Sequence, residues 1–215
     1  MSVQMPLIIM FTDSLNLPIK SDRSKQQDQI LILPGMTWED YEQLVAAESS
    51  YLISYFDNQI TIVSPSPSHE RLSRIALILI DTYCVHFNIK SWALGSTDLK
   101  KAQVAGKQPD ESFDIGTYKG TVTSRDLAVE INYTSGSFAD LDKYKEFQVK
   151  EVWLWEQHKI NFYRFDDSDY QLIEVSHVLE KLSSNLVNQF VNLNMISQDD
   201  GTIKAEFLQA LDPDF

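Results

Sequence analysis

The chain has 215 residues with 43% hydrophobic content, which is enough to bury one substantial core. Its single cysteine excludes an intrachain disulfide and a Cys-rich zinc site, and its four histidines show no short metal-ligand spacing. The net charge of −13 argues against broad, non-specific binding to nucleic acid, which depends on Lys and Arg neutralising phosphates.

The charge is unevenly distributed along the chain. Residues 66–108 carry six basic and three acidic residues, whereas residues from Asp166 onward carry two basic and ten acidic ones. The early apolar run Pro6 to Phe11 is too short to span a membrane and lacks the basic start of a signal peptide. We therefore expect a soluble, cytoplasmic protein that does not enter a membrane.

Local signals predict the elements of the first half. Residues 13–29 are polar and contain Pro18, so we assign residues 1–30 to an N-terminal arm or linker. Thr37 and Asp40 have the spacing of a capping box that starts a helix. Two strands follow, at 51–56 and 59–64, joined by Asp57-Asn58, a favourable tight-turn pair.

A long helix begins at Ser66, where a plausible cap precedes Pro67 at the first helical position. A strand at 127–132, a short helix from about 139 to 148 and a hairpin of "VWLW" with "INFYRF" come next. This order predicts an α+β (α/β-like) core over residues 31–165, with a mixed central β-sheet flanked by helices. Residues 166–215 are expected to form an acidic extension with two modest helices.

The strand "LAVEIN" places an acid, Glu130, inside an otherwise apolar run. Leu127, Val129 and Ile131 share one face, so Glu130 lies on the other and could simply point to water. Alternatively, it pairs with Asp110, which stands 20 residues earlier at another predicted strand, across a turn-rich connection. Two close carboxylates repel, so a proton, a base or a hard cation must compensate, and removing one carboxylate should stabilise the metal-free protein. Oxygen ligands suit Mg²⁺ or Mn²⁺.

Five stretches together resemble the Uma-two family of bacterial restriction endonucleases, part of the PD-(D/E)XK nuclease superfamily. In the family's order they are "MTWEDYEQL", "YFDNQITIVSPSPSHERLS", "GSTDLKKAQVAGKQPDESFDIG", "DLAVEINYTSGS" and "KYKEFQVKEVWLWE". The resemblance implies a restriction-endonuclease-like fold and hydrolysis of DNA phosphodiester bonds. It also implies that Asp110, Glu130 and the carbonyl of Ile131 hold Mg²⁺ or Mn²⁺, with DNA as the partner and a homodimer possible.

The resemblance suggests Glu70, in the first turn of the long helix, as a third acid. The alternative is an acid that favours a helix N-terminus or pairs with Arg74. His69 has the spacing of a residue at the edge of the core, an interpretation we prefer over a metal ligand. Lys100 and Lys101, just before the Pro-Asp element, could contact phosphate or be solvated.

The chain departs from the family pattern at its lysine. Asn132 stands two residues after Glu130, where the superfamily has Lys, and Asp140 occupies the alternative family position on the following helix. Lys143, three residues later, lies on nearly the same helical face and is our candidate catalytic lysine. The departure leaves open a second function, a catalytically weakened nuclease-fold protein that binds DNA or another protein. Trp153, Trp155 and Cys84 are interpreted as packing residues.

Overall fold

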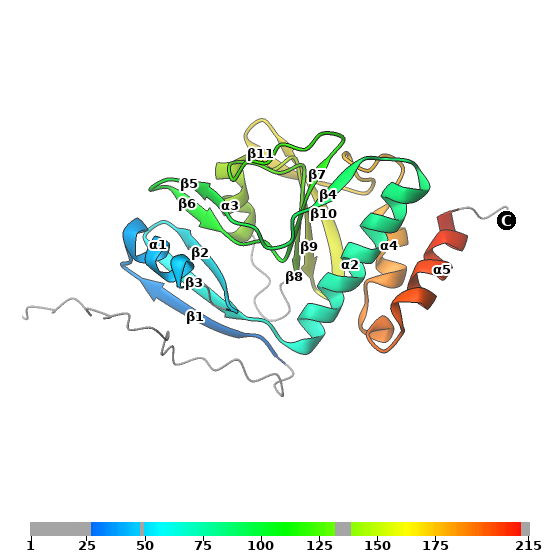
Figure 1. Cartoon of the computed structure of the whole chain (residues 1–215), viewed down its shortest axis with the longest axis horizontal. Coiled ribbons are helices and arrows are strands. Elements are labelled where there is room, and N and C mark those ends of the chain that lie inside the picture. The colour runs from blue at the N-terminus through cyan, green and yellow to red at the C-terminus, as the bar shows by residue number, and fades with distance from the viewer. Residues whose placement is uncertain (1–26, 48–49, 132–138, 212–215) are drawn as a thin grey trace, which may run out of the picture.

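The computed structural model describes residues 27–47, 50–131 and 139–211. Two β-sheets and five α-helices make up this part of the chain (Figure 1). The smaller sheet has five strands in the order β1-β3-β2-β6-β5, and the larger has six in the order β11-β10-β9-β8-β7-β4. The two sheets lie side by side, with the smaller one on the left in Figure 1. The expected α+β class with a mixed central sheet is confirmed.

The smaller sheet is antiparallel and follows local sequence signals. Its strands are β1 (Gln29–Pro34), β2 (Leu52–Phe56), β3 (Gln59–Ser64), β5 (Leu99–Lys101) and β6 (Ala105–Lys107). Asp57 and Asn58 both adopt positive φ at the β2–β3 turn, as their residue types predict. The capping box of Thr37 and Asp40 also forms and starts α1 (Trp38–Ala46).

One face of the smaller sheet is covered by α1, and the opposite face is left for a cavity. Buried residues of α1 pack against alternate residues of β2 and β3, namely Ile53, Tyr55, Ile60 and Ile62. The residues between them, including Leu52, Ser54, Thr61 and Val63, point the other way and line the cavity.

The larger sheet contains one parallel pair, β8 (Leu127–Ile131) with β9 (Glu151–Glu156). Its other strands, β4 (Ser91–Ala93), β7 (Glu111–Ile115), β10 (Lys159–Asp166) and β11 (Asp169–Ile173), pair antiparallel to their neighbours. The predicted β9–β10 hairpin is therefore present.

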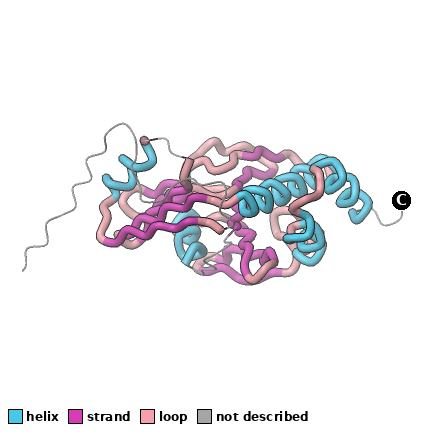
Figure 2. The backbone as a smooth tube through the Cα atoms, turned by 90° about the horizontal axis from the view of Figure 1, so that it is seen from below, coloured by secondary structure: helices cyan, strands magenta, loops and turns pink. Residues whose placement is uncertain are grey.

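Helices cover both faces of the larger sheet. α2 (Pro67–His86), α4 (Ser184–Phe190) and α5 (Asp200–Leu211) lie on one face and share its main apolar core (Figures 1 and 2). α3 (Ala139–Phe147) lies on the other face and packs on β5, β6 and β11. A short 3₁₀ helix, Leu193–Met195, precedes α5. None of the described helices is both long and apolar enough to cross a membrane.

The chain differs from the sequence-based division at both ends of the core. Gln29 and Ile30, expected in the arm, belong to β1 and pair with β3. At the other end, β11 extends the larger sheet, and Ile203 and Phe207 of α5 are fully buried against the main core. The described part of residues 166–215 is thus integrated into the fold, because its apolar side chains pack into the same core as those of α2. Residues 1–26 lie outside the described part.

Candidate functional site

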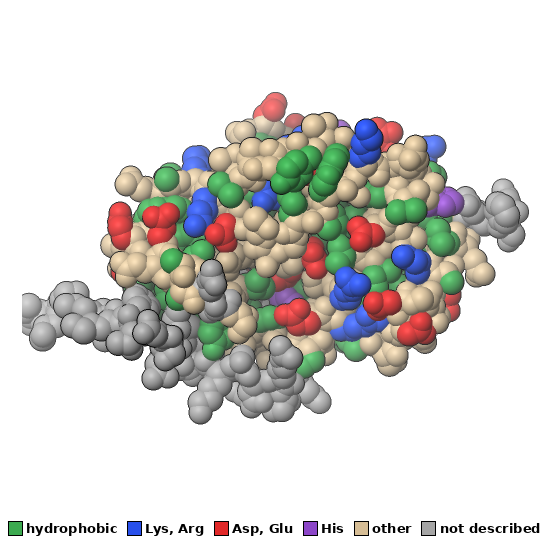
Figure 3. All heavy atoms as spheres, viewed as in Figure 1, with side chains coloured by type: hydrophobic (Ala, Val, Ile, Leu, Met, Phe, Trp, Pro, Cys, Tyr) green, Lys and Arg blue, Asp and Glu red, His purple; other side chains and the backbone are tan. Residues whose placement is uncertain are grey.

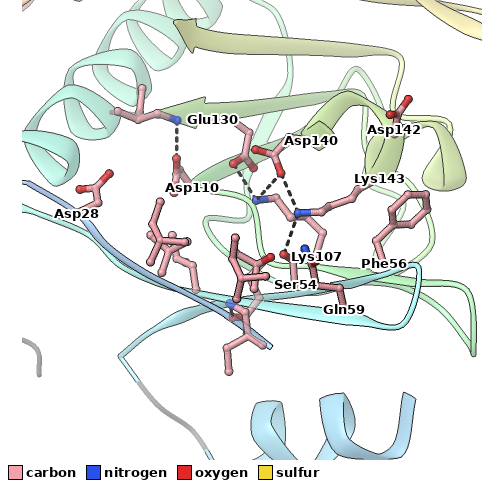
Figure 4. Close-up of a pocket in the computed structure, with 18 of the residues that line it drawn as sticks. Asp28, Ser54, Phe56, Gln59, Lys107, Asp110, Glu130, Asp140, Asp142 and Lys143 are labelled. Carbon is pink, nitrogen blue, oxygen red and sulfur yellow. Dashed lines mark hydrogen bonds and ion pairs between the residues drawn. The ribbon is translucent and has the colours of Figure 1, made fainter. Parts of the chain in front are cut away.

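A cavity of about 360 Å³ lies between the two sheets and collects the charged residues that the sequence singled out (Figure 4). One wall is the apolar and hydroxylic face of β1, β2 and β3. The other is built from the end of β6, the starts of β7 and α2, the end of β8, and α3. Its ionisable side chains are those of His69, Lys107, Asp110, Glu130, Asp140, Asp142 and Lys143.

Glu130 is buried in this wall, with 2% of its surface exposed. Its neighbours Val129 and Ile131 face the α2 core, so strand alternation turns Glu130 toward the cavity. Lys107 Nζ lies 2.9 Å from Glu130 Oε2, and the Tyr144 hydroxyl donates a hydrogen bond to Oε1. Burial raises the pKa of Glu130 to about 7, although the Lys107 charge opposes this. The interpretation that Glu130 points to water is wrong.

Asp110 lies on the same wall, immediately before β7. Glu111 pairs with Val129, and this antiparallel register, continued by one residue, aligns Asp110 with Glu130. Asp110 Oδ2 accepts a hydrogen bond of 2.6 Å from the Ile131 N–H. Burial would raise the pKa of Asp110, but the His69 charge and hydrogen bond, together with Lys107 and the Ile131 N–H, lower it overall. The expectation that a β-hairpin brings both carboxylates to one place is confirmed.

His69 connects Asp110 to the N-terminal segment. It lies in the first turn of α2, its Nε2 is 2.9 Å from Asp110 Oδ1, and its Nδ1 is 3.0 Å from Asp28 Oδ2. Burial alone would lower the pKa of His69, but Asp110 and Asp28 outweigh it and raise the pKa to about 10. The sequence had placed His69 at a core edge and Asp28 in the arm. Their contact spans 41 positions, so no local pattern could reveal it.

Glu70 does not join this group. Its side chain is exposed and is not among the residues that line the cavity. Its charge acts on Glu111 instead. The pKa of Glu111 is raised to about 7, mainly by burial and then by the charge of Asp110, with a smaller contribution from Glu70. Helical geometry explains the difference, since adjacent helical residues project in directions about 100° apart and His69 takes the inward one.

The lysine that contacts Glu130 is Lys107, from the smaller sheet. Lys143 also lines the cavity, but its Nζ lies 3.1 Å from both Ser54 Oγ and Asp140 Oδ1. Lys107 stands two residues before Pro109-Asp110, and this nearness along the chain is the local signal that points to it. Burial would lower the pKa of Lys107, but Glu130, Asp140 and Asp110 raise it, so its ammonium group stays charged.

Lys100 and Lys101 lie outside the cavity lining. Lys100 Nζ is 3.3 Å from Asp98, and Lys101 Nζ is 2.7 Å from Glu146. The packing interpretation of Trp153, Trp155 and Cys84 is confirmed, since all three are buried in the main core.

The cavity has the donors that a divalent cation needs, although they are not gathered around an ion position. Six carboxylates line it against two lysines and one histidine, which leaves an excess of three negative charges when His69 is protonated. Within the described ranges, no three His, Cys, Asp or Glu side chains are close enough together to hold an ion. Asp110 and Glu130 are paired instead with internal donors. Carboxylate oxygens are nevertheless the ligands that Mg²⁺ and Mn²⁺ prefer, so the chemistry of these donors fits either ion. Asn132 lies outside the described residues.

The fold of this chain is shared with a protein of known structure. The chain is similar to a crystal structure described as "a putative nuclease belonging to DUF820 from Anabaena variabilis ATCC 29413", with a TM-score of 0.54 and 16% identity. The match covers 73% of this chain and 99% of that one, and at this identity it shows a shared fold. No curated protein matches the chain. The sequence profile described as "Uma2: Putative restriction endonuclease" matches residues 38–195, well over half of the chain. The chain therefore belongs to the Uma2 family.

Proposed function

We propose that this protein is a divalent-metal-dependent endonuclease that hydrolyses phosphodiester bonds of DNA. The observation that carries the proposal is that Asp110 and Glu130 are both buried on one wall of an acid-rich cavity, where Lys107 donates a hydrogen bond to Glu130. Membership in a family of restriction-endonuclease-like proteins supports it.

The charge distribution favours a mechanism that depends on a cation. The acidic cavity would repel phosphate, and the face of the molecule in Figure 3 shows acidic and basic side chains interspersed without a broad basic surface. A positive charge between the carboxylates and the substrate would remove this repulsion.

Asp110, Glu130 and the carbonyl of Ile131 are the groups that would hold Mg²⁺ or Mn²⁺. The bound ion would supply a Lewis acid for the phosphodiester and lower the pKa of a coordinated water. Lys107 places a fixed positive charge beside Glu130, where it can stabilise negative charge that develops on phosphorus. Lys143, anchored by Ser54 and Asp140, can contact a phosphate oxygen at the cavity's other side.

The test is nicking of supercoiled plasmid with Mg²⁺ or Mn²⁺ by the wild type, Glu130→Gln and Asp110→Asn. We expect both variants to lose at least a hundredfold in rate, since each removes a charged ion ligand. Glu111→Gln is the matched control, because Glu111 adjoins Asp110 in sequence yet does not line the cavity, and it should cut normally. Equal cleavage by wild type and Glu130→Gln would refute the assignment.

One observation favours a second candidate, a nuclease-fold protein that binds DNA or another protein with little cleavage. Asp140 stands where the family has lysine, and its carboxylate lies 3.1 Å from Lys143 Nζ and 3.9 Å from Lys107 Nζ. It thereby offsets part of the positive charge of both lysines. Metal-independent DNA binding without nicking in either ion would support this candidate over the enzyme.

Cutting both strands of a duplex requires two active sites or two successive events. We therefore expect two copies of the chain to act together, as a homodimer on DNA. Linear product formed without a nicked intermediate would support paired action.

A further inference from the structure

We infer that the cavity takes DNA as an unpaired strand, with a base of that strand stacked on Phe56. The inference rests on the proposed nuclease function and deepens it, because it names the form of DNA that the site accepts: an unpaired segment in place of an intact duplex.

The wall that the smaller sheet contributes is largely apolar, although it faces a charged wall. Ile30 of β1, Val63 of β3 and Leu52 of β2 are cross-strand neighbours, so their side chains form one patch that lines the cavity. Ile32 adjoins them and is 54% exposed. Apolar surface of this kind gains free energy when a ligand covers it. The wall therefore indicates a ligand with an apolar surface of its own.

An aromatic ring stands at one end of this wall. Phe56, the last residue of β2, is half-buried and lies beside Lys143, away from Asp110 (Figure 4). Among the described residues that line the cavity, it is the one Phe, Tyr or Trp side chain. Proteins that bind single strands combine such rings, on which bases stack, with cations that contact the backbone. Phe56 and Lys143 provide one group of each kind.

An intact duplex does not match this cavity. Its base faces are stacked on one another, so it offers a protein phosphates, sugars and the edges of the bases. The apolar wall would then face a polar backbone and remain without a partner. The volume of about 360 Å³ also lies near the lower end of the range for pockets that hold one small ligand, about 300–1,000 Å³. An unpaired nucleotide has both the size and the apolar face that the cavity requires.

The distribution of charge supports the same conclusion. Binding to a duplex depends on Lys and Arg that neutralise many phosphates. The described cavity lining has two lysines, Lys107 and Lys143, and the face in Figure 3 has no broad basic surface. Stacking on a ring does not depend on charge, so it supplies affinity that two lysines cannot. An acidic protein can therefore bind an unpaired strand through few phosphates.

The test compares three fluorescent oligonucleotides of one sequence: a single strand, its blunt duplex, and a duplex with a central run of unpaired nucleotides. Stopped-flow anisotropy with the full chain and Mg²⁺ reports binding before cleavage, and gels of the same mixtures report cutting. We expect the two substrates with unpaired nucleotides to bind at least about tenfold more tightly than the duplex and to be cut preferentially.

Substitutions at Phe56 test the stacking itself. Phe56→Leu keeps an apolar side chain but removes the ring, so it should weaken single-strand binding at least about fivefold, whereas Phe56→Tyr should retain it. Phe165→Leu is the matched control. Phe165 is also a half-buried phenylalanine that packs on the same apolar cluster, but it does not line the cavity, so its replacement should leave binding unchanged.

The outcomes separate this inference from the proposed function. A duplex that is bound and cut as well as the single strand would overturn the inference and leave the nuclease function intact. Preferential binding of unpaired DNA without cutting in Mg²⁺ or Mn²⁺ would support the inference and refute the nuclease. Binding of none of the three oligonucleotides would overturn both. Wild-type affinity in a folded Phe56→Leu protein would refute the role of Phe56.

Discussion

Lys107 and Lys143 bring two ammonium groups into one cavity, with different partners. Lys107 contacts the buried Glu130 carboxylate, whereas Lys143 contacts Ser54 and Asp140. The sequence favoured Lys143 because it lies near the position of the family lysine. The contacts favour Lys107, because a lysine that stabilises charge at the proposed ion site must lie close to a proposed ion ligand.

We predict that Lys107→Met reduces the cleavage rate by about a hundred- to a thousandfold, whereas Lys143→Met reduces it by less. Lys107→Met also removes a charge that lowers the pKa of Glu130, so that pKa rises further. Rates of single-turnover nicking at saturating Mn²⁺, compared with circular dichroism of each variant, would check this. A large loss in Lys143→Met with a normal Lys107→Met would restore the sequence-based assignment.

Among the elements, helix α5 differs most from its prediction, because it packs into the main core and is not a separate extension. Its Phe207 side chain is fully buried and contacts Phe190 edge-on, with ring centroids 5.4 Å apart. Asp200, its first residue, forms ion pairs with Arg71 and Arg74 of α2. Sequence alone favoured an appendage because the chain from Asp166 onward is strongly acidic.

Phe207→Ala should lower the free energy of unfolding by about 3–5 kcal/mol, because it leaves a cavity in the main core. The adjacent Leu208 is 36% exposed, so Leu208→Ala is the control and should cost less than about 1 kcal/mol. Urea denaturation of the three proteins measures both changes. Similar small losses in both variants would show that α5 is dispensable for the core.

For the whole molecule, the network around Asp110 links global stability to pH. Burial would raise the pKa of Asp110, but the charge and hydrogen bond of His69, together with Lys107 and the Ile131 N–H, outweigh it and lower the pKa below its ordinary value of 3.8. A lowered folded-state pKa means that the carboxylate stabilises the fold above its ordinary pKa and loses this contribution as pH falls through its folded value. The expectation that removing a carboxylate stabilises the metal-free protein therefore does not fit Asp110.

We predict that Asp110→Asn lowers the metal-free free energy of unfolding by about 3 kcal/mol at pH 7, as expected for breaking a buried ion pair. The difference from wild type should shrink below pH 4 as the wild-type carboxylate is protonated. Urea denaturation in the presence of a chelator, repeated from pH 7 to pH 3, measures this. A more stable Asp110→Asn at neutral pH would show that repulsion with Glu130 dominates.

Short-range signals in the sequence determined much of the fold. Thr37 with Asp40, Asp57 with Asn58, and Ser66 with Pro67 each act within a few residues, so their helix starts and turn could be predicted directly. The pairing of Asp110 with Glu130 followed from two strands joined by a turn-rich connection. The resemblance to a family then gave these two acids a chemical meaning.

Tertiary structure decided which other residues join them. Asp28 immediately precedes β1, His69 lies in the first turn of α2, and Lys107 is the last residue of β6. The contacts of these residues with one another, Asp110 and Glu130 join parts of both sheets. Strand β1 lacked a clear alternation of polar and apolar residues, and the acidic character of residues 166–215 suggested an extension and not a helix buried against the core. Sequence periodicity shows which way a side chain points within its own element. It does not show which distant element will face it, because that depends on how the two sheets and their helices pack.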